Sequence, residues 1–152
     1  ILFVLFFVIM IYFIIKYFRK KKVSVLEDQS IISVAEKYLQ ELSQKVDPRG
    51  TNLDEMTLRL SRIFREYIQR DFNIPARELS TSEILHQLQE LDLEETDKKI
   101  LSTVFKKLDE IKFTGKLIDP NEFTSVYGSI EDFLLRRKQE FESSRYSSKE
   151  EK

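Results

Sequence analysis

Cysteine and tryptophan are absent from the 152-residue chain, and histidine, glycine and proline number only one, three and three. Without cysteine the chain can form no disulfide, no thiolate metal site and no cysteine nucleophile. Gly50, Gly115 and Gly128 lie too far apart for a phosphate-binding loop or a dinucleotide fingerprint. The single histidine, His86, has no evident ligand set, so we interpret it as a surface or half-buried helix residue. The sequence therefore predicts a protein that is not an enzyme and uses no cofactor or metal ion.

Charge is nearly missing from the beginning of the chain, where residues 1–18 contain no acidic side chain and one basic one, Lys16. At about 1.5 Å per residue, a helix of this length reaches roughly 27 Å, close to the ~30 Å hydrocarbon core of a bilayer. A core helix is rarely apolar on every face. A signal peptide carries positive charge before its apolar run, not after it. We predict a single transmembrane helix at 1–18. Because the sequence starts at Ile1 and not at Met, we expect a fragment or a processed form.

Basic residues follow the apolar run at once. Such clusters are retained on the cytoplasmic side of a membrane, long basic side chains reach the headgroups, and aromatic residues favour the interface. The five charges would also attract an anionic leaflet. We expect contact with membrane lipid, a cytoplasmic location for everything from Val23 on, and the following residues at the membrane interface: Lys16, Tyr17, Arg19, Lys20, Lys21 and Lys22.

The rest of the chain is acidic. Apart from the five basic residues of the anchor, 20 basic residues stand against 26 acidic ones, a balance of −6 that repels nucleic acid. Residues 81–90 and the helix expected from 94 resemble a helix-turn-helix in outline, but a run of carboxylates at 92–97 would face the DNA. We interpret those carboxylates as caps of a helix start. We predict no nucleic-acid binding, and a membrane-tethered nucleic-acid-binding regulator is the weakest alternative.

Apolar residues recur at helical spacing in five stretches, and no alternating stretch predicts a strand. The fold class is therefore all-α: one N-terminal transmembrane helix followed by a cytoplasmic bundle of about five helices. Thr51 or Asn52 could cap the second helix, which we expect to end near Asn73. Ser80 and Glu83 have the spacing of a capping box at the start of the next helix. The expected organisation is a transmembrane helix at 1–18, a basic linker at 19–30, a helical domain at 31–142 and a disordered tail at 143–152.

Four segments resemble the cytoplasmic helical region of Bat-type aerotolerance membrane proteins of bacteria, in particular the region after the last membrane span of BatD-like proteins or a short membrane-anchored relative. They are Tyr67-Ile68-Gln69-Arg70-Asp71-Phe72, Ile74-Pro75-Ala76-Arg77-Glu78, Leu79-Ser80-Thr81-Ser82-Glu83-Ile84-Leu85 and Leu108-Asp109-Glu110-Ile111-Lys112-Phe113. The family-motif residues are Leu79, Ser80, Thr81, Glu83, Asp109, Lys112 and Phe113. The chain departs from many relatives at Thr114-Gly115-Lys116. Residues 1–152 do not include the large β-rich part that full-length BatD-like proteins carry before the span; we expect the BatD-like comparison to hold for a fragment and the shorter relatives for a complete chain.

The resemblance implies a non-enzymatic component of the bacterial inner membrane that works beside a von Willebrand A-domain protein and a MoxR-type AAA+ ATPase in envelope stress or assembly. From the residues alone, Lys112 favours a helix C-terminus, Asp109 can pair with it, and Phe113 covers the edge of the core. We therefore expect a single-pass adaptor whose cytoplasmic domain docks partner proteins. The alternative is a structural or assembly subunit that acts mainly through its span. Candidate docking charges are Arg59, Arg62, Arg65, Arg136 and Arg137.

Overall fold

The computed structural model describes residues 32–113 and 117–150. Within these ranges it contains five helices and no strand, which confirms the all-α class and the bundle of about five helices. The helices are α2 (Val34–Lys45), α3 (Leu53–Phe72), α4 (Thr81–Gln89), α5 (Glu95–Phe113) and α6 (Pro120–Glu150).

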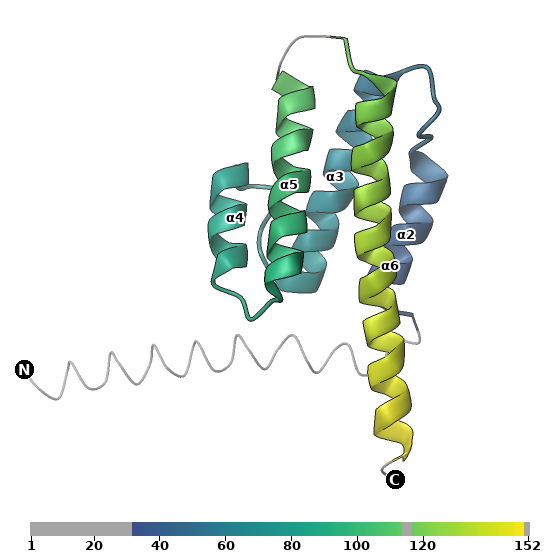
Figure 1. Cartoon of the computed structure of the whole chain (residues 1–152), viewed down its shortest axis with the longest axis vertical. Helices are drawn as coiled ribbons and strands as arrows, with labels where there is room; N and C mark the ends of the chain where they lie inside the picture. Colours follow the sequence, from purple (N-terminus) through teal and green to yellow (C-terminus); the bar gives the residue numbers. More distant parts are fainter. Residues whose placement is uncertain (1–31, 114–116, 151–152) are drawn as a thin grey trace, which may run out of the picture. The chain divides into compact units, whose positions relative to one another are not determined.

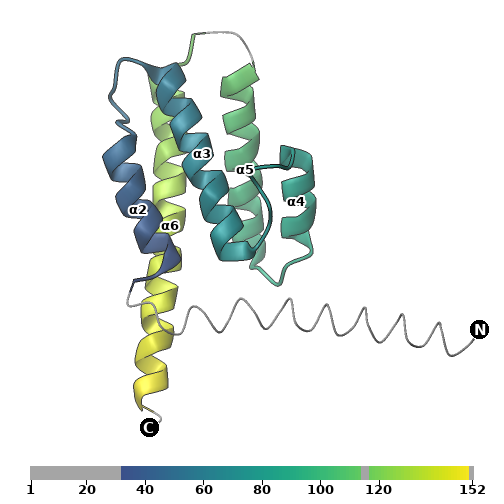
Figure 2. The same ribbon diagram turned by 180° about the vertical axis from the view of Figure 1, so that it is seen from behind.

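Four of these helices form an up-and-down bundle, in which α2, α3, α5 and α6 alternate in direction (Figure 1). The helices α3 and α6 are the central pair, because α2 and α5 each pack against both of them. The short helix α4 packs against α5 on the outside of the bundle, as both views show (Figures 1 and 2). The loop between α3 and α4 therefore runs from the C-terminal end of α3 to the side of the bundle formed by α5.

Aromatic rings fill the centre of the bundle. The ring of Phe64 on α3 lies 5.2 Å from that of Phe105 on α5 and 6.4 Å from that of Phe133 on α6, measured between centroids. Tyr67, one turn further along α3, contacts Tyr38 on α2 at 5.8 Å and Phe133 at 6.0 Å. These separations suit edge-to-face and tilted ring pairs. One aromatic cluster thus joins all four bundle helices.

Local polar residues define the helix ends. Asn52, not Thr51, caps α3, since its side-chain oxygen accepts from the amide of Glu55 at 3.3 Å. The same helix ends at Asn73, which adopts the left-handed conformation with φ 55°, as asparagine tolerates well. The predicted capping box is confirmed: the Glu83 amide donates to Ser80 Oγ, and the Ser80 amide donates to Glu83 Oε2 at 2.8 Å.

Replacement of Ser80 by alanine tests this cap. Ser80→Ala removes the acceptor for the first turn of α4, and we expect a loss of about 1 kcal/mol in the free energy of unfolding, measured by urea denaturation. The bonds from the Ser80 hydroxyl and amide lower the pKa of Glu83. Because the carboxylate form is favoured in the folded state, this contribution is present above the unfolded pKa and is lost as the pH falls through the folded pKa. The difference in the free energy of unfolding between Ser80→Ala and the wild type should therefore become smaller in acid. A difference that does not change with pH would contradict the capping box.

The predicted membrane segment lies outside the described residues, as do the linker at 19–30 and the interface residues Lys16, Tyr17, Arg19, Lys20, Lys21 and Lys22. Among residues 32–113 and 117–150, no helix is both long enough and apolar enough to cross a bilayer. The membrane anchor stays a prediction from the sequence.

The predicted disorder from residue 143 on is wrong for residues 143–150, which continue α6 to Glu150. Its last turns extend past the ends of the other bundle helices (Figures 1 and 2). A helix already nucleated by packing propagates at little cost, and no proline or glycine interrupts it after Gly128. Serine hydroxyls also donate back to backbone oxygens, as from Ser143 to Gln139 at 3.0 Å and from Ser147 to Ser143 at 3.3 Å. The polar composition of this segment was therefore a poor guide to its conformation.

Candidate docking surface

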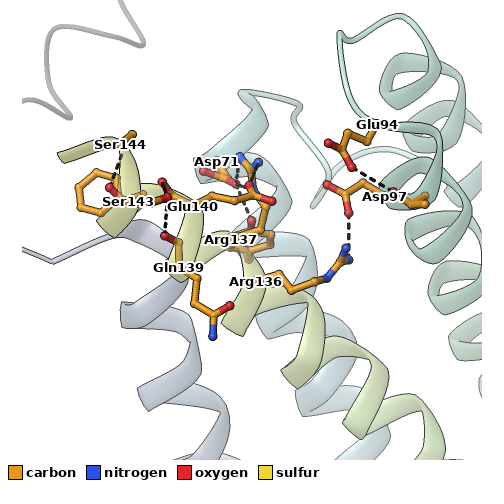
Figure 3. Close-up of polar contacts among 12 residues, drawn as sticks. Asp71, Glu94, Asp97, Arg136, Arg137, Gln139, Glu140, Ser143 and Ser144 are labelled. Atoms are coloured by element: carbon orange, nitrogen blue, oxygen red, sulfur yellow. Dashed lines mark hydrogen bonds and ion pairs between the residues drawn. The ribbon is translucent and has the colours of Figure 1, made fainter. Parts of the chain in front are cut away.

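Three consecutive basic residues tie α6 to the other bundle helices. Arg136 Nη2 lies 2.9 Å from Asp97 Oδ1 on α5, and Arg137 Nη2 lies 3.3 Å from Asp71 Oδ2 on α3 (Figure 3). Lys138 Nζ lies 3.1 Å from Glu36 Oε1 on α2. Successive residues point about 100° apart around a helix, so neighbours in sequence reach different partners. Arg136 and Arg137 are thus engaged inside the domain, which argues against them as docking charges.

Asp97 lies in the first turn of α5, as expected of a carboxylate at a helix start, but it also has a partner on another helix. It is 5% exposed and is the only acidic residue that is fully buried among the described residues. Arg136 supplies its compensating charge from α6. The two carboxylates that precede it in sequence, Glu94 and Glu95, are exposed as expected of a helix start.

A buried tyrosine belongs to the same network. Tyr67 is fully buried and its hydroxyl donates to Asp71, which also accepts from Arg137. Burial, followed by the negative charge of Asp71, holds the pKa of Tyr67 well above its ordinary value near 10. The hydroxyl stays protonated in the folded state.

This raised pKa predicts a loss of stability in alkali. The unfolded chain releases the Tyr67 proton near pH 10 while the folded chain keeps it, so the contribution is fully present below pH 10 and falls as the pH rises above it. Urea denaturation between neutral pH and alkali should show this decline in the wild type and a shallower one in Tyr67→Phe. Equally steep profiles for the two proteins would contradict the assignment.

Arg65 organises the loop between α3 and α4. Its Nη1 donates to the backbone oxygens of Ala76 at 2.7 Å and Leu79 at 2.8 Å, and its Nη2 donates to Thr81 Oγ1 at 3.0 Å. The guanidinium also lies over the ring of Phe105, 5.6 Å from its centroid. The planar fork of an arginine can serve several acceptors at once. One half-buried side chain of α3 therefore holds the start of α4 and the loop before it.

A shallow basic groove lies beside this clamp, between α3, the loop and the C-terminal end of α5. We call it the basic groove. It has a volume of about 490 Å³ and is lined by Leu58, Ser61, Arg62, Arg65, Arg77, Leu79 and Lys112. Four of these residues carry positive charge and none carries negative charge. Arg62 and Lys112 are exposed, and the Arg77 side chain is 60% exposed and reaches Glu66 only at 3.7 Å.

A second groove, between α2 and α3, differs in its charge. It has a volume of about 540 Å³ and shares Leu58 and Arg62 with the basic groove. Two of its carboxylates pair with cations of the same helix, Glu41 with Lys45 at 2.6 Å and Glu55 with Arg59. Arg59, a predicted docking charge, is therefore partly neutralised, whereas Arg62 stands on the ridge between the two grooves. The unbalanced positive charge belongs to the basic groove.

The structure distributes the family-motif residues unevenly. Leu79 and Lys112 line the basic groove, Thr81 accepts from Arg65, and Ser80 and Glu83 form the capping box of α4. Asp109 makes no ion pair with Lys112 among the described contacts, and Lys112 Nζ lies instead 5.1 Å from the centroid of the Phe113 ring.

Phe113 does not cover the core, and that prediction is wrong. Its side chain is 73% exposed. The buried positions of α5 end at Ile111, and a residue two positions later points about 200° away around the helix. The ring is therefore presented to solvent beside Lys112, a residue of the basic groove.

Two other predictions concern chemistry. The His86 side chain is 76% exposed and its Nδ1 lies 3.7 Å from Glu90, as expected of a surface residue. In the described ranges no group of histidine, aspartate and glutamate residues could hold a metal ion.

Helical periodicity alone indicates Arg62 and Arg65 as residues of the basic groove, but it gives no signal that Arg77, Leu79 and Lys112 join them. Those three residues come from the α3–α4 loop and from α5, and only the packing of the bundle brings them together.

Comparison of the chain with models of protein families, with curated proteins and with solved structures finds no match. The resemblance to Bat-type proteins stays a prediction based on the quoted motifs.

Proposed function

We propose that this protein is a membrane-anchored, non-enzymatic adaptor whose cytoplasmic helical domain docks partner proteins. The observation that carries the proposal is the basic groove, where exposed cations stand beside exposed apolar side chains. Leu58 on its rim is 51% exposed, and Phe113 next to Lys112 is 73% exposed. Arginine and aromatic side chains are enriched among residues that dominate binding energy at protein interfaces. Such a surface suits a transient complex with another protein.

The partners that the Bat resemblance suggests are a von Willebrand A-domain protein and a MoxR-type AAA+ ATPase, within an envelope-stress or assembly system of the bacterial inner membrane. Two of the quoted motif residues, Leu79 and Lys112, belong to the basic groove. This placement supports a role of the motif in docking over a role in folding alone. Our proposal does not depend on which of the two proteins is the partner.

Crosslinking mass spectrometry on native membranes tests the proposal, with the protein tagged at its C-terminus. We expect crosslinks from lysines of residues 31–142 to another protein, with Lys112 among them and Lys99, an exposed residue of α5 outside the groove, as an internal comparison. Crosslinks confined to residues 1–30, or only between copies of this chain, would contradict docking and favour a structural or assembly subunit that acts through its span.

Deletion of residues 31–142, with the anchor kept, separates the same two functions genetically. The adaptor model predicts that the deletion removes function, because the docking domain is lost. The span model predicts that function remains, because the helical domain is only a spacer.

A further inference from the structure

We propose that the basic groove binds an acidic segment of a partner protein that also carries a leucine-like or aromatic anchor residue. This inference rests on the proposed docking function and names the surface and the chemistry of its ligand. The first reason is charge. Arg65 spends its hydrogen bonds on neutral acceptors, the Ala76 and Leu79 carbonyls and the Thr81 hydroxyl, so its positive charge is not neutralised.

The other cations of the groove are more exposed than Arg65. Arg62 and Lys112 are exposed, and the 3.7 Å separation of Arg77 from Glu66 is long for an ion pair. No carboxylate lines the groove. A ligand with several carboxylates would therefore meet four positive charges at close range, and the exposed forks of Arg62 and Arg77 can each bind a carboxylate through two donors.

The second reason is the apolar part of the lining. Leu58 is 51% exposed, and Leu79 is half-buried in the lining of the groove. An anion without apolar groups, such as inorganic phosphate, would leave these side chains in water. A peptide that places a leucine or phenylalanine side chain between its carboxylates would cover them. The volume of about 490 Å³ can take one or two such side chains with the adjoining backbone.

The third reason favours a protein segment over a lipid surface or a nucleic acid. Apart from the anchor, the chain has 20 basic and 26 acidic residues, so its overall field repels large polyanions. A short acidic segment responds mainly to the local charge of the groove, because charges beyond about 8–10 Å are screened at physiological ionic strength. The groove is a local cluster of positive charge in a chain that is acidic apart from its anchor.

A peptide selection tests the inference on the full chain, kept in solution with a nonionic detergent because residues 1–18 are strongly apolar. A random peptide library displayed on phage is selected against the wild type. We expect the enriched peptides to combine several aspartate or glutamate residues with a leucine or aromatic residue. The affinity of one such synthetic peptide is then measured by fluorescence anisotropy at two salt concentrations.

Matched variants place the binding site. The double variant Arg62→Glu, Arg77→Glu should lower the affinity for the peptide by about tenfold or more. The control Lys99→Glu, Lys106→Glu makes the same change in net charge at two exposed lysines of α5 outside the groove, and it should bind the peptide as the wild type does. Thermal unfolding followed by circular dichroism verifies that both variants fold. Because all four side chains are exposed, we expect them to do so.

Several results would overturn the inference. They are enrichment of basic or purely apolar peptides, equal weakening by both double variants, or binding of anionic vesicles at the groove in preference to every selected peptide. If the selection fails while native crosslinks join another face of residues 31–142 to a partner, the adaptor function stands and the groove assignment falls. If selected peptides bind the groove while native membranes yield no crosslinked protein, the groove assignment stands and the adaptor function falls.

Discussion

Phe64→Ala is expected to lower the free energy of unfolding by about 3–5 kcal/mol, the largest effect of any single substitution considered for this chain. Phe64 is 1% exposed and its ring touches the rings of Tyr67, Phe105 and Phe133. Truncation to alanine removes the buried ring and leaves a cavity whose walls belong to three rigid helices. Because those walls can relax only partly, the cavity adds its own cost to the lost burial.

A domain of this size has a total stability of about 5–15 kcal/mol, so the variant should keep only part of it. Urea denaturation followed by circular dichroism measures the loss. Phe113→Ala is the matched control, since it removes the same side chain from a position that is 73% exposed, and it should change stability by less than about 0.5 kcal/mol. A loss below about 1 kcal/mol in Phe64→Ala would contradict the central aromatic cluster.

Arg65→Ala is expected to cost about 2–3 kcal/mol, because it removes three charge-assisted hydrogen bonds and leaves carbonyl groups without their donor. Ala76, which supplies one of these carbonyls, is fully buried, so water cannot easily replace the guanidinium there. The loss should be local as well as global. Amides from residue 76 to residue 81 should exchange hydrogen faster than those of the bundle core.

Two comparisons sharpen this prediction. Arg59→Ala lies on the same helix and removes only an exposed pair with Glu55, so it should cost less than about 1 kcal/mol. Arg65→Lys should not restore the loop, because a lysine ammonium is a single point charge and cannot span three acceptors as a planar fork does. Full stability in Arg65→Lys would show that charge alone holds the loop and that the geometry of the clamp is unimportant.

The same clamp links stability to the proposed docking. Arg65 fixes the backbone of Ala76 and Leu79, and Arg77 lies between them in the chain. The position of Arg77 in the basic groove thus depends on Arg65, which holds the backbone on both sides of it. We therefore expect Arg65→Ala to weaken the binding of an acidic peptide, even though the Arg65 guanidinium, bound to carbonyl groups, is the least exposed cation of the groove.

Local sequence signals predicted most of the helices. The apolar spacing of α3 and α5 and the capping residues Ser80 and Asn52 depend on neighbours three or four positions away. Interactions at this range are determined by helix geometry alone. The disordered tail was predicted from composition and was wrong for residues 143–150, since composition does not register that a packed helix already supplies the nucleus.

Tertiary structure decided what the charged residues do. Arg62, Arg65, Arg136 and Arg137 are alike in sequence, yet Arg65 clamps a loop 11 to 16 residues away, Arg136 and Arg137 meet Asp97 and Asp71 on other helices, and Arg62 faces solvent. A long basic side chain finds its partner through the packing of helices, and no periodicity within its own helix encodes that partner. The sequence by itself therefore determined the all-α class and the capping box that starts α4, while α2 begins at Val34, a few residues after the expected start at 31. The burial of Asp97, the exposure of Phe113 and the assembly of the basic groove followed only from how the helices pack.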